Sequence, residues 1–148
     1  MVSLLISYLS YSGNTKEVAE LIEHNCQKLG VTADLYRIGT SEPIPDVASY
    51  DAVMVGCFTW GKGETPKKMK KFILDVGFKP ACVYVFGTGD TQFGGDELFC
   101  SAADKLHRFF HSPLPVLKVE QSPRGSQEIL VEEWTQRVVE HYERMINE

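Results

Sequence analysis

Small hydrogen-bonding residues are concentrated in one loop near the start of the chain, Ser10–Thr15 (SYSGNT), here called the first loop. It lies between an apolar run, Val2–Leu9, and a segment whose apolar residues recur at helical spacing. Its hydroxyls, the Asn14 amide and the N–H groups at a helix start can all donate to a phosphate, and Gly13 permits close backbone approach. A capped strand-to-helix turn uses some of the same residue types, so the loop alone leaves both interpretations open.

Two common nucleotide motifs are missing from the chain. It has no G-x-x-x-x-G-K-[ST] sequence, and no G-x-G-x-x-G follows the first apolar run. The hypothesis that remains is a small phosphate held by neutral donors.

Aromatic residues occur in two further loops that each follow an apolar run. The second loop, Thr59–Pro66 (TWGKGETP), contains Trp60, and the third loop, Thr88–Glu97 (TGDTQFGGDE), contains Phe93. Each ring could instead pack locally, Trp60 on the sheet edge and Phe93 in a small satellite contact. Taken together, a phosphate site and two aromatic walls suit a planar ring that carries one phosphate, such as flavin mononucleotide (FMN).

The elements that must position these loops alternate between strand and helix. Apolar runs and periodicity predict strands at 2–9, 32–38, 51–58, 81–89 and 115–120, and helices at about 14–29, 66–76, 98–110 and 128–146. This alternation predicts one α/β domain, residues 1–148, with a five-stranded parallel sheet and helices on both faces. In the strand order 2-1-3-4-5, the three loops would meet at the carboxyl edge of the sheet.

Bulk properties exclude several other classes. The net charge of −5 and the pI of about 5.4 argue against nucleic acid as the main partner. The four cysteines form no C-x-x-C pair, and neither a metal site nor a disulfide framework is expected. No apolar run approaches bilayer length, and the N-terminus resembles a strand more than a signal peptide. We therefore expect a cytoplasmic protein without a membrane partner.

Three loop motifs, together with one helix, carry a resemblance to a known family. SYSGNT at Ser10–Thr15, TWGKGE at Thr59–Glu64, FGTGDTQFG at Phe86–Gly94 and FCSAADKL at Phe99–Leu106 resemble the flavodoxins over the whole chain. The predicted helix that contains FCSAADKL is followed by PLPVLKVE without a long insertion, and in this the chain resembles the short-chain bacterial subgroup. The resemblance implies the flavodoxin-like three-layer sandwich.

The resemblance also implies an FMN site and a function. The first loop would hold the phosphate, Trp60 and Phe93 would cover the two faces of the ring, and neighbouring backbone groups would meet its polar edge. The residues so implied are Ser10, Tyr11, Ser12, Gly13, Asn14, Thr15, Thr59, Trp60, Gly61, Lys62, Gly63, Thr88, Gly89, Asp90 and Phe93. The protein would be a monomeric low-potential carrier that cycles FMN between semiquinone and hydroquinone. It would dock transiently at the flavin edge with a flavodoxin or ferredoxin reductase and with acceptor enzymes.

Some positions depart from the family pattern. Phe93 stands where tyrosine is usual, and Phe58 stands where a small or hydroxyl residue is frequent. Lys62 occupies a position that is often acidic, so its charge should favour the anionic hydroquinone. The segment FGGDELFC is longer than the usual path from the stacking aromatic to the next helix.

Four lysines, at positions 67, 68, 70 and 71, form a basic cluster in an otherwise acidic chain. They are either the solvated face of a helix or a docking patch beside the loops.

Other functions are less well supported by the residues. A flavoprotein activator of ribonucleotide reductase usually has a shorter or altered second loop. A receiver domain needs acidic residues after the first strand, and a quinone reductase needs a substrate pocket. The loops contain no nucleophile–base pair, as expected for a carrier rather than an enzyme.

Overall fold

The computed structural model of the chain describes residues 3–11, 13–59, 65–77, 80, 82–89, 100–121 and 123–146. The elements in these ranges are, in chain order, β1 (Ser3–Tyr8), α1 (Asn14–Lys28), β2 (Thr32–Arg37), the 3-10 helix η1 (Val47–Ser49), β3 (Ala52–Phe58), α2 (Lys67–Val76), β4 (Val83–Gly89), α4 (Ser101–Phe110), β5 (Leu117–Glu120) and α5 (Ser126–Ile146).

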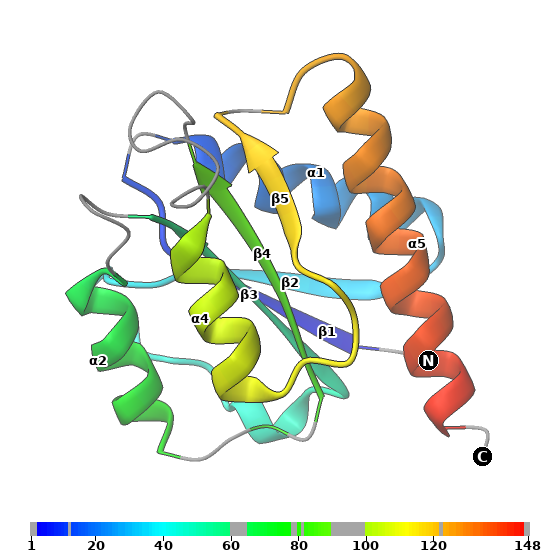
Figure 1. Cartoon of the computed structure of the whole chain (residues 1–148). Helices are drawn as coiled ribbons and strands as arrows, with labels where there is room; N and C mark the ends of the chain where they lie inside the picture. Colours follow the sequence, from blue (N-terminus) through cyan, green and yellow to red (C-terminus); the bar gives the residue numbers. More distant parts are fainter. Residues whose placement is uncertain are drawn as a thin grey trace.

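The described strands form one parallel sheet in the order β2-β1-β3-β4-β5, as the sequence predicted. Helices α1 and α5 cover one face of this sheet, and α2 and α4 cover the other (Figure 1). Because the strands are parallel, their carboxyl ends lie at one edge. The first loop leaves β1 at that edge, and Phe58 and Gly89 end β3 and β4 there.

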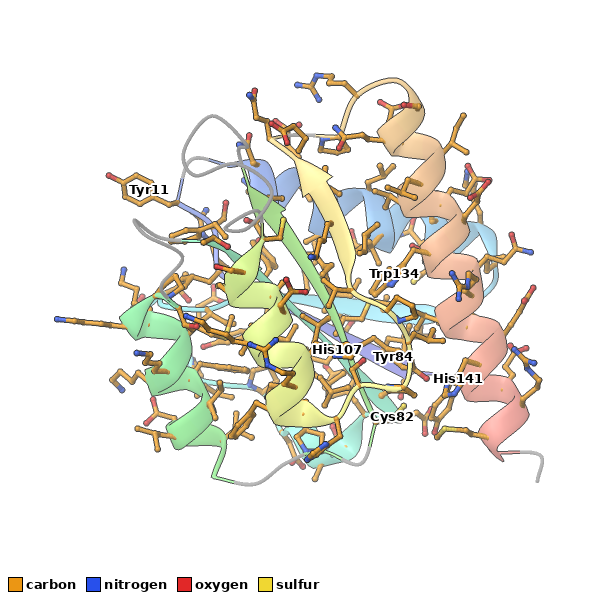
Figure 2. The ribbon with its side chains drawn as sticks, viewed as in Figure 1. Tyr11, Cys82, Tyr84, His107, Trp134 and His141 are labelled. Carbon is orange, nitrogen blue, oxygen red and sulfur yellow. The ribbon has the colours of Figure 1, made fainter. Side chains whose placement is uncertain are left out.

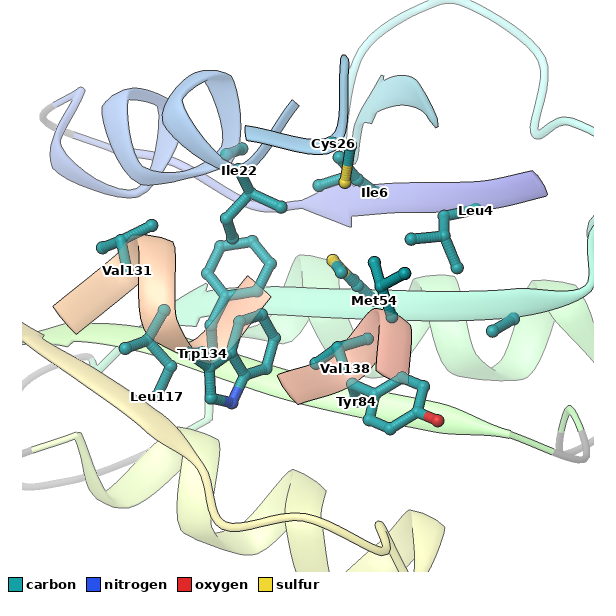
Figure 3. Close-up of a cluster of buried hydrophobic side chains, with 14 of the residues drawn as sticks. Leu4, Ile6, Ile22, Cys26, Met54, Tyr84, Leu117, Val131, Trp134 and Val138 are labelled. Atoms are coloured by element: carbon teal, nitrogen blue, oxygen red, sulfur yellow. The ribbon is translucent and has the colours of Figure 1, made fainter. Parts of the chain in front are cut away.

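Alternate residues of each central strand face opposite helical layers. Leu4 and Ile6 of β1 belong to the core beneath α1 and α5, whereas Leu5 belongs to the core beneath α2 and α4. All three are fully buried, which is why these strands are continuous apolar runs rather than alternating ones. Figure 3 shows the first of these cores, where Trp134 of α5 lies close to the strands of the sheet. Trp134 donates its indole N–H to the Pro115 carbonyl at 3.2 Å.

The helix next to the second loop has clear start and stop signals. Pro66 precedes α2, and its carbonyl accepts hydrogen bonds from Met69 and Lys70 at 3.1 and 3.3 Å. Gly77 ends the helix in the left-handed conformation, φ 78°. Met69 and Phe72 are buried on its inner face.

Element ends differ from the sequence prediction by small amounts. β5 begins two residues later than predicted, at Leu117, and α5 begins two residues earlier, at Ser126. The 3-10 helix η1 lies inside a segment that was expected to be a loop with one short turn. No described helix is both long enough and apolar enough to cross a membrane.

Gly56 in the middle of β3 is required by the packing of Phe86. A Cβ atom at position 56 would lie 2.1 Å from Phe86 Cζ and 2.2 Å from its Cε2. Phe86 is fully buried, and its ring packs edge-on against Trp134 with centroids 6.1 Å apart, so it has little room to move.

We predict that Gly56→Ala lowers the free energy of unfolding by roughly 2 to 3 kcal/mol, because it overpacks this core. The measurement is urea unfolding followed by circular dichroism. Phe86→Leu removes the ring atoms that would clash, so Gly56→Ala should cost clearly less in that background. Equal costs in the two backgrounds would show that the ring is not what restricts position 56.

Candidate functional site

The first loop is organised by the hydroxyl of Ser10. Its Oγ accepts hydrogen bonds from the backbone N–H groups of Gly13 at 3.2 Å and Lys16 at 3.3 Å. Ser10 is buried, and these bonds turn the chain from β1 into α1. Because both are bonds that Oγ accepts, the hydroxyl hydrogen of Ser10 remains able to donate to a ligand.

Gly13 precedes α1 with φ 100°, a conformation that favours glycine, and it contributes no side-chain cap. The N–H groups of Asn14 and Thr15 find no acceptor among the described residues, while those of Lys16 and Glu17 bond to Ser10 and Gly13. The helix therefore presents free donors and its positive end to the first loop. This arrangement suits an anion and fits a phosphate.

A cation lies next to the same loop. Arg37, the last residue of β2, donates from Nη2 to the carbonyl of Ser10 at 3.3 Å. The sequence analysis missed this residue because it assigned the anion site to neutral donors alone. The signal was available in the strand order, since the ends of β2 and β1 are neighbours and Tyr8 pairs with Arg37.

The hydroxyl of Thr15 faces a second threonine across the sheet. Thr15 Oγ1 and Thr88 Oγ1 lie 2.7 Å apart, and both residues are buried. The pair ties the start of α1 to the end of β4, and so ties the first loop to the strand that leads into the third. Direct contact of Thr15 or Thr88 with the cofactor stays a prediction.

An aromatic pair that the sequence analysis did not anticipate lies beside the first loop. The rings of Tyr11 and Phe58 are tilted at 47°, with centroids 6.0 Å apart. Tyr11 is 74% exposed, and Figure 2 shows it extending outward from the loop. Phe58, noted in the sequence as a departure from the family pattern, therefore packs against Tyr11 and provides an apolar surface at the end of β3.

Thr59 links the end of β3 to α4. Its Oγ1 accepts a hydrogen bond from the Ala102 N–H at 3.2 Å, which satisfies a donor in the first turn of α4. Cys100 immediately before this helix is buried and has a positive φ of 55°. The carbonyl of Gly89 accepts a hydrogen bond from the Gln121 N–H at 2.7 Å, and the predicted contact of Gly89 with the cofactor stays a prediction.

Seven of the predicted site residues lie outside the described residues: Ser12, Trp60, Gly61, Lys62, Gly63, Asp90 and Phe93. The predicted ring walls and the predicted peptide flip therefore remain predictions. The structure brings together the others, from Ser10 and Thr15 to Thr59 and Thr88, at the carboxyl edge of β1, β3 and β4.

The described residues near the loops offer binding groups rather than reactive ones. Burial raises the pKa of the Cys57 thiol, and it raises that of Cys100 to about 12, so both are neutral at physiological pH. Within the described ranges, no cluster of three histidine, cysteine or acidic residues could hold a metal ion.

His141 lies far from the site (Figure 2). Its Nδ1 atom lies 2.8 Å from the phenol oxygen of Tyr84.

Comparisons with known proteins agree with this geometry. The family model described as flavodoxin matches residues 6–134, and the chain belongs to the flavodoxin family. It is 32% identical over 136 residues to "Probable flavodoxin 2" of Bacillus subtilis strain 168, a match that covers 86% of this chain and 88% of the relative.

Two further proteins are similar to the chain, one in structure and one in sequence. A solved short-chain flavodoxin associated with a non-canonical PDU bacterial microcompartment superposes with a TM-score of 0.84. The superposition covers 96% of this chain and 99% of that one at 20% identity, and it supports the fold. "Protein NrdI" of Mycoplasmoides gallisepticum is 33% identical over 116 residues, with coverage of 74% of this chain and 69% of the relative.

We predict that Thr15→Val lowers the free energy of unfolding by about 1 to 3 kcal/mol, because it leaves the buried Thr88 hydroxyl without this partner. The double variant Thr15→Val/Thr88→Val should cost less than the sum of the single changes. Urea unfolding of all four proteins measures this coupling.

Thr135→Val is the matched control for this cycle. Thr135 is also fully buried, but its hydroxyl donates to the Val131 carbonyl of its own helix at 2.8 Å. The free-energy costs of Thr135→Val and Thr88→Val should therefore add in the double variant. If the free-energy costs of Thr15→Val and Thr88→Val also add, the hydrogen bond between these two threonines is contradicted.

Proposed function

We propose that this protein is a one-electron carrier that binds FMN non-covalently and moves electrons between a reductase and acceptor enzymes. The observation that carries the proposal is the first loop, which presents free N–H groups of α1 and the Ser10 hydroxyl at the carboxyl edge of a 2-1-3-4-5 sheet. Membership of the flavodoxin family supports the same cofactor.

The residues of the first loop would bind and orient the phosphate of FMN. Ser10 and the N–H groups of Asn14 and Thr15 would donate hydrogen bonds, and the positive end of α1 and the nearby Arg37 would stabilise the negative charge. Such bonds to an ionised group are roughly twice as strong as neutral ones. The loop would thereby fix one end of the cofactor, while the second and third loops enclose its ring.

The roles of the second and third loops are part of this proposal. Trp60 and Phe93 would cover the ring, and the peptide between Gly61 and Lys62 would turn to meet it. Bound FMN would supply one-electron chemistry between semiquinone and hydroquinone at low potential, and the apolar ring environment would disfavour the charged reduced form. Lys62 would partly oppose that effect.

The proposed carrier acts in the cytoplasm as a monomer, with residues 1–148 as one domain. It would perform no substrate turnover of its own and would pass electrons only to other redox proteins. Its partners would be redox proteins that dock transiently at the flavin edge, with no nucleic acid and no membrane involved.

Stepwise reduction of the FMN-loaded protein under anaerobic conditions tests this function. We expect a yellow protein that accumulates a blue neutral semiquinone before full reduction, because a carrier needs two well-separated one-electron steps. The visible spectrum at each step is the measurement. A protein that remains colourless after incubation with FMN would contradict the proposal.

A second candidate, an activator of ribonucleotide reductase, is supported by the match to Protein NrdI. The second loop argues against it, since TWGKGE keeps the arrangement that such activators usually lack. In the same titration, a single two-electron step with little semiquinone would contradict the carrier.

A further inference from the structure

A surface cleft lies between α2 and the segment that follows β2. Its volume is about 390 Å³. Apolar and aromatic side chains line part of it, including Tyr36, Ile38 and Phe72. Lys68 and Lys71 line it from α2, and Glu42 and Asp75 are the acidic residues in its lining. The cleft therefore combines an apolar surface with cationic side chains.

The side chain of Lys68 lies against the backbone of Gly39 across the cleft. A Cβ atom at Gly39 would lie 2.8 Å from Lys68 Cδ, so the stem of Lys68 lies directly against the glycine. Gly39 has φ 86°, which also disfavours other residues. The lysine stem thus packs on the protein while its ammonium group stays in water.

The lysines of α2 are mostly uncompensated. Lys71 pairs with Asp75 at 2.8 Å, whereas Lys67, Lys68 and Lys70 have no ion pair within the ranges that the structure describes. All four are exposed, and Figure 2 shows nitrogen-tipped side chains projecting from the outer side of α2. The rest of the chain is strongly acidic, since its net charge remains −5 with these four cations included.

These lysines also stand where the helix itself disfavours them. They lie in the first five residues of α2, at the positive end of its dipole, and the first turn holds no acidic residue. A cluster that breaks a local preference without an internal partner is expected where a binding function requires it. Leu74, one turn after Lys70 on the same helix, is 79% exposed and adds an apolar contact point.

Backbone contacts connect the lining of the cleft to the strand that leads into the first loop. Ile38, in its lining, donates its N–H to the Tyr8 carbonyl at 2.7 Å. The preceding residue, Arg37, contacts Ser10 in the first loop. A partner seated in the cleft would therefore lie near the first loop, which is the proposed phosphate site.

We propose that the lysine face of α2 and this cleft form a docking surface for an acidic segment of a partner protein, with an apolar side chain of that segment inserted in the cleft. The role of this partner in electron transfer rests on the proposed function. Its recognition rests on charge complementarity and on the apolar lining, neither of which requires bound flavin.

The probe is the blocked peptide Glu-Glu-Phe-Glu-Glu, titrated into ¹⁵N-labelled protein without flavin at low salt. We expect chemical-shift changes centred on Gly39, Lys68 and Phe72. Affinity should fall at least about fivefold between 20 and 200 mM salt, because exposed charges are screened. Glu-Glu-Ser-Glu-Glu should bind more weakly, and Lys-Lys-Phe-Lys-Lys should not shift these signals.

Two variants of equal charge change decide the outcome. Lys68→Glu should weaken peptide binding at least about tenfold, since it reverses a charge at the cleft, while Lys28→Glu on α1 should change it less than about twofold. FMN affinity should be the same in both variants, so this test can fail without affecting the proposed cofactor. The proposal would be overturned if the peptide causes no shifts at the cleft, or if the shifts are centred elsewhere. Equal effects of the two variants on peptide binding would also overturn it.

Discussion

The free N–H groups at the start of α1 are the constraint on which the site depends. A helix must leave its first donors without intrahelical partners, and a side-chain cap commonly satisfies one of them. Here the residue before the helix is Gly13, which has no side chain to do so, and Ser10 reaches only the donors of Gly13 and Lys16. The remaining donors point into a loop that is bounded by Arg37 and by the ring of Phe58. An anion bound here would satisfy these donors without any charged side chain in the loop itself.

The parallel sheet brings groups from other strand ends next to the free N–H groups of α1. β1 lies between β2 and β3, so the end of β2 supplies Arg37 and the end of β3 supplies Phe58 and Thr59. β4 is one strand further on, yet Thr88 still reaches Thr15 at the start of α1. Each contact joins the first loop or the start of α1 to the end of a strand, and the buried strands hold those ends in register. The close fit of Gly56 against Phe86 shows how little freedom that register has.

Sequence patterns predicted the fold, and the first loop as a strand-to-helix turn rich in hydrogen-bond donors, because both rest on local signals. Continuous apolar runs such as Val83–Phe86 identify strands buried on both faces, and Gly13 with Asn14 marks a helix start. Contacts between segments were harder to predict. The Thr15–Thr88 pair, the Tyr11–Phe58 rings and the capping of α4 by Thr59 depend on side-chain directions across the sheet, which residue spacing does not give. The start of β5 was also misplaced, because Pro115 and Val116 continue the apolar run before pairing begins.

The affinity difference between FMN and riboflavin tests the central claim most directly, because the two flavins differ only by the phosphate. Quenching of flavin fluorescence on titration with the protein measures both dissociation constants. Two or more hydrogen bonds to a charged phosphate, at about 1.5 to 3 kcal/mol each, predict that FMN binds at least about a hundredfold more tightly. Equal affinities for FMN and riboflavin would show that the first loop is only a strand-to-helix turn and would contradict the account.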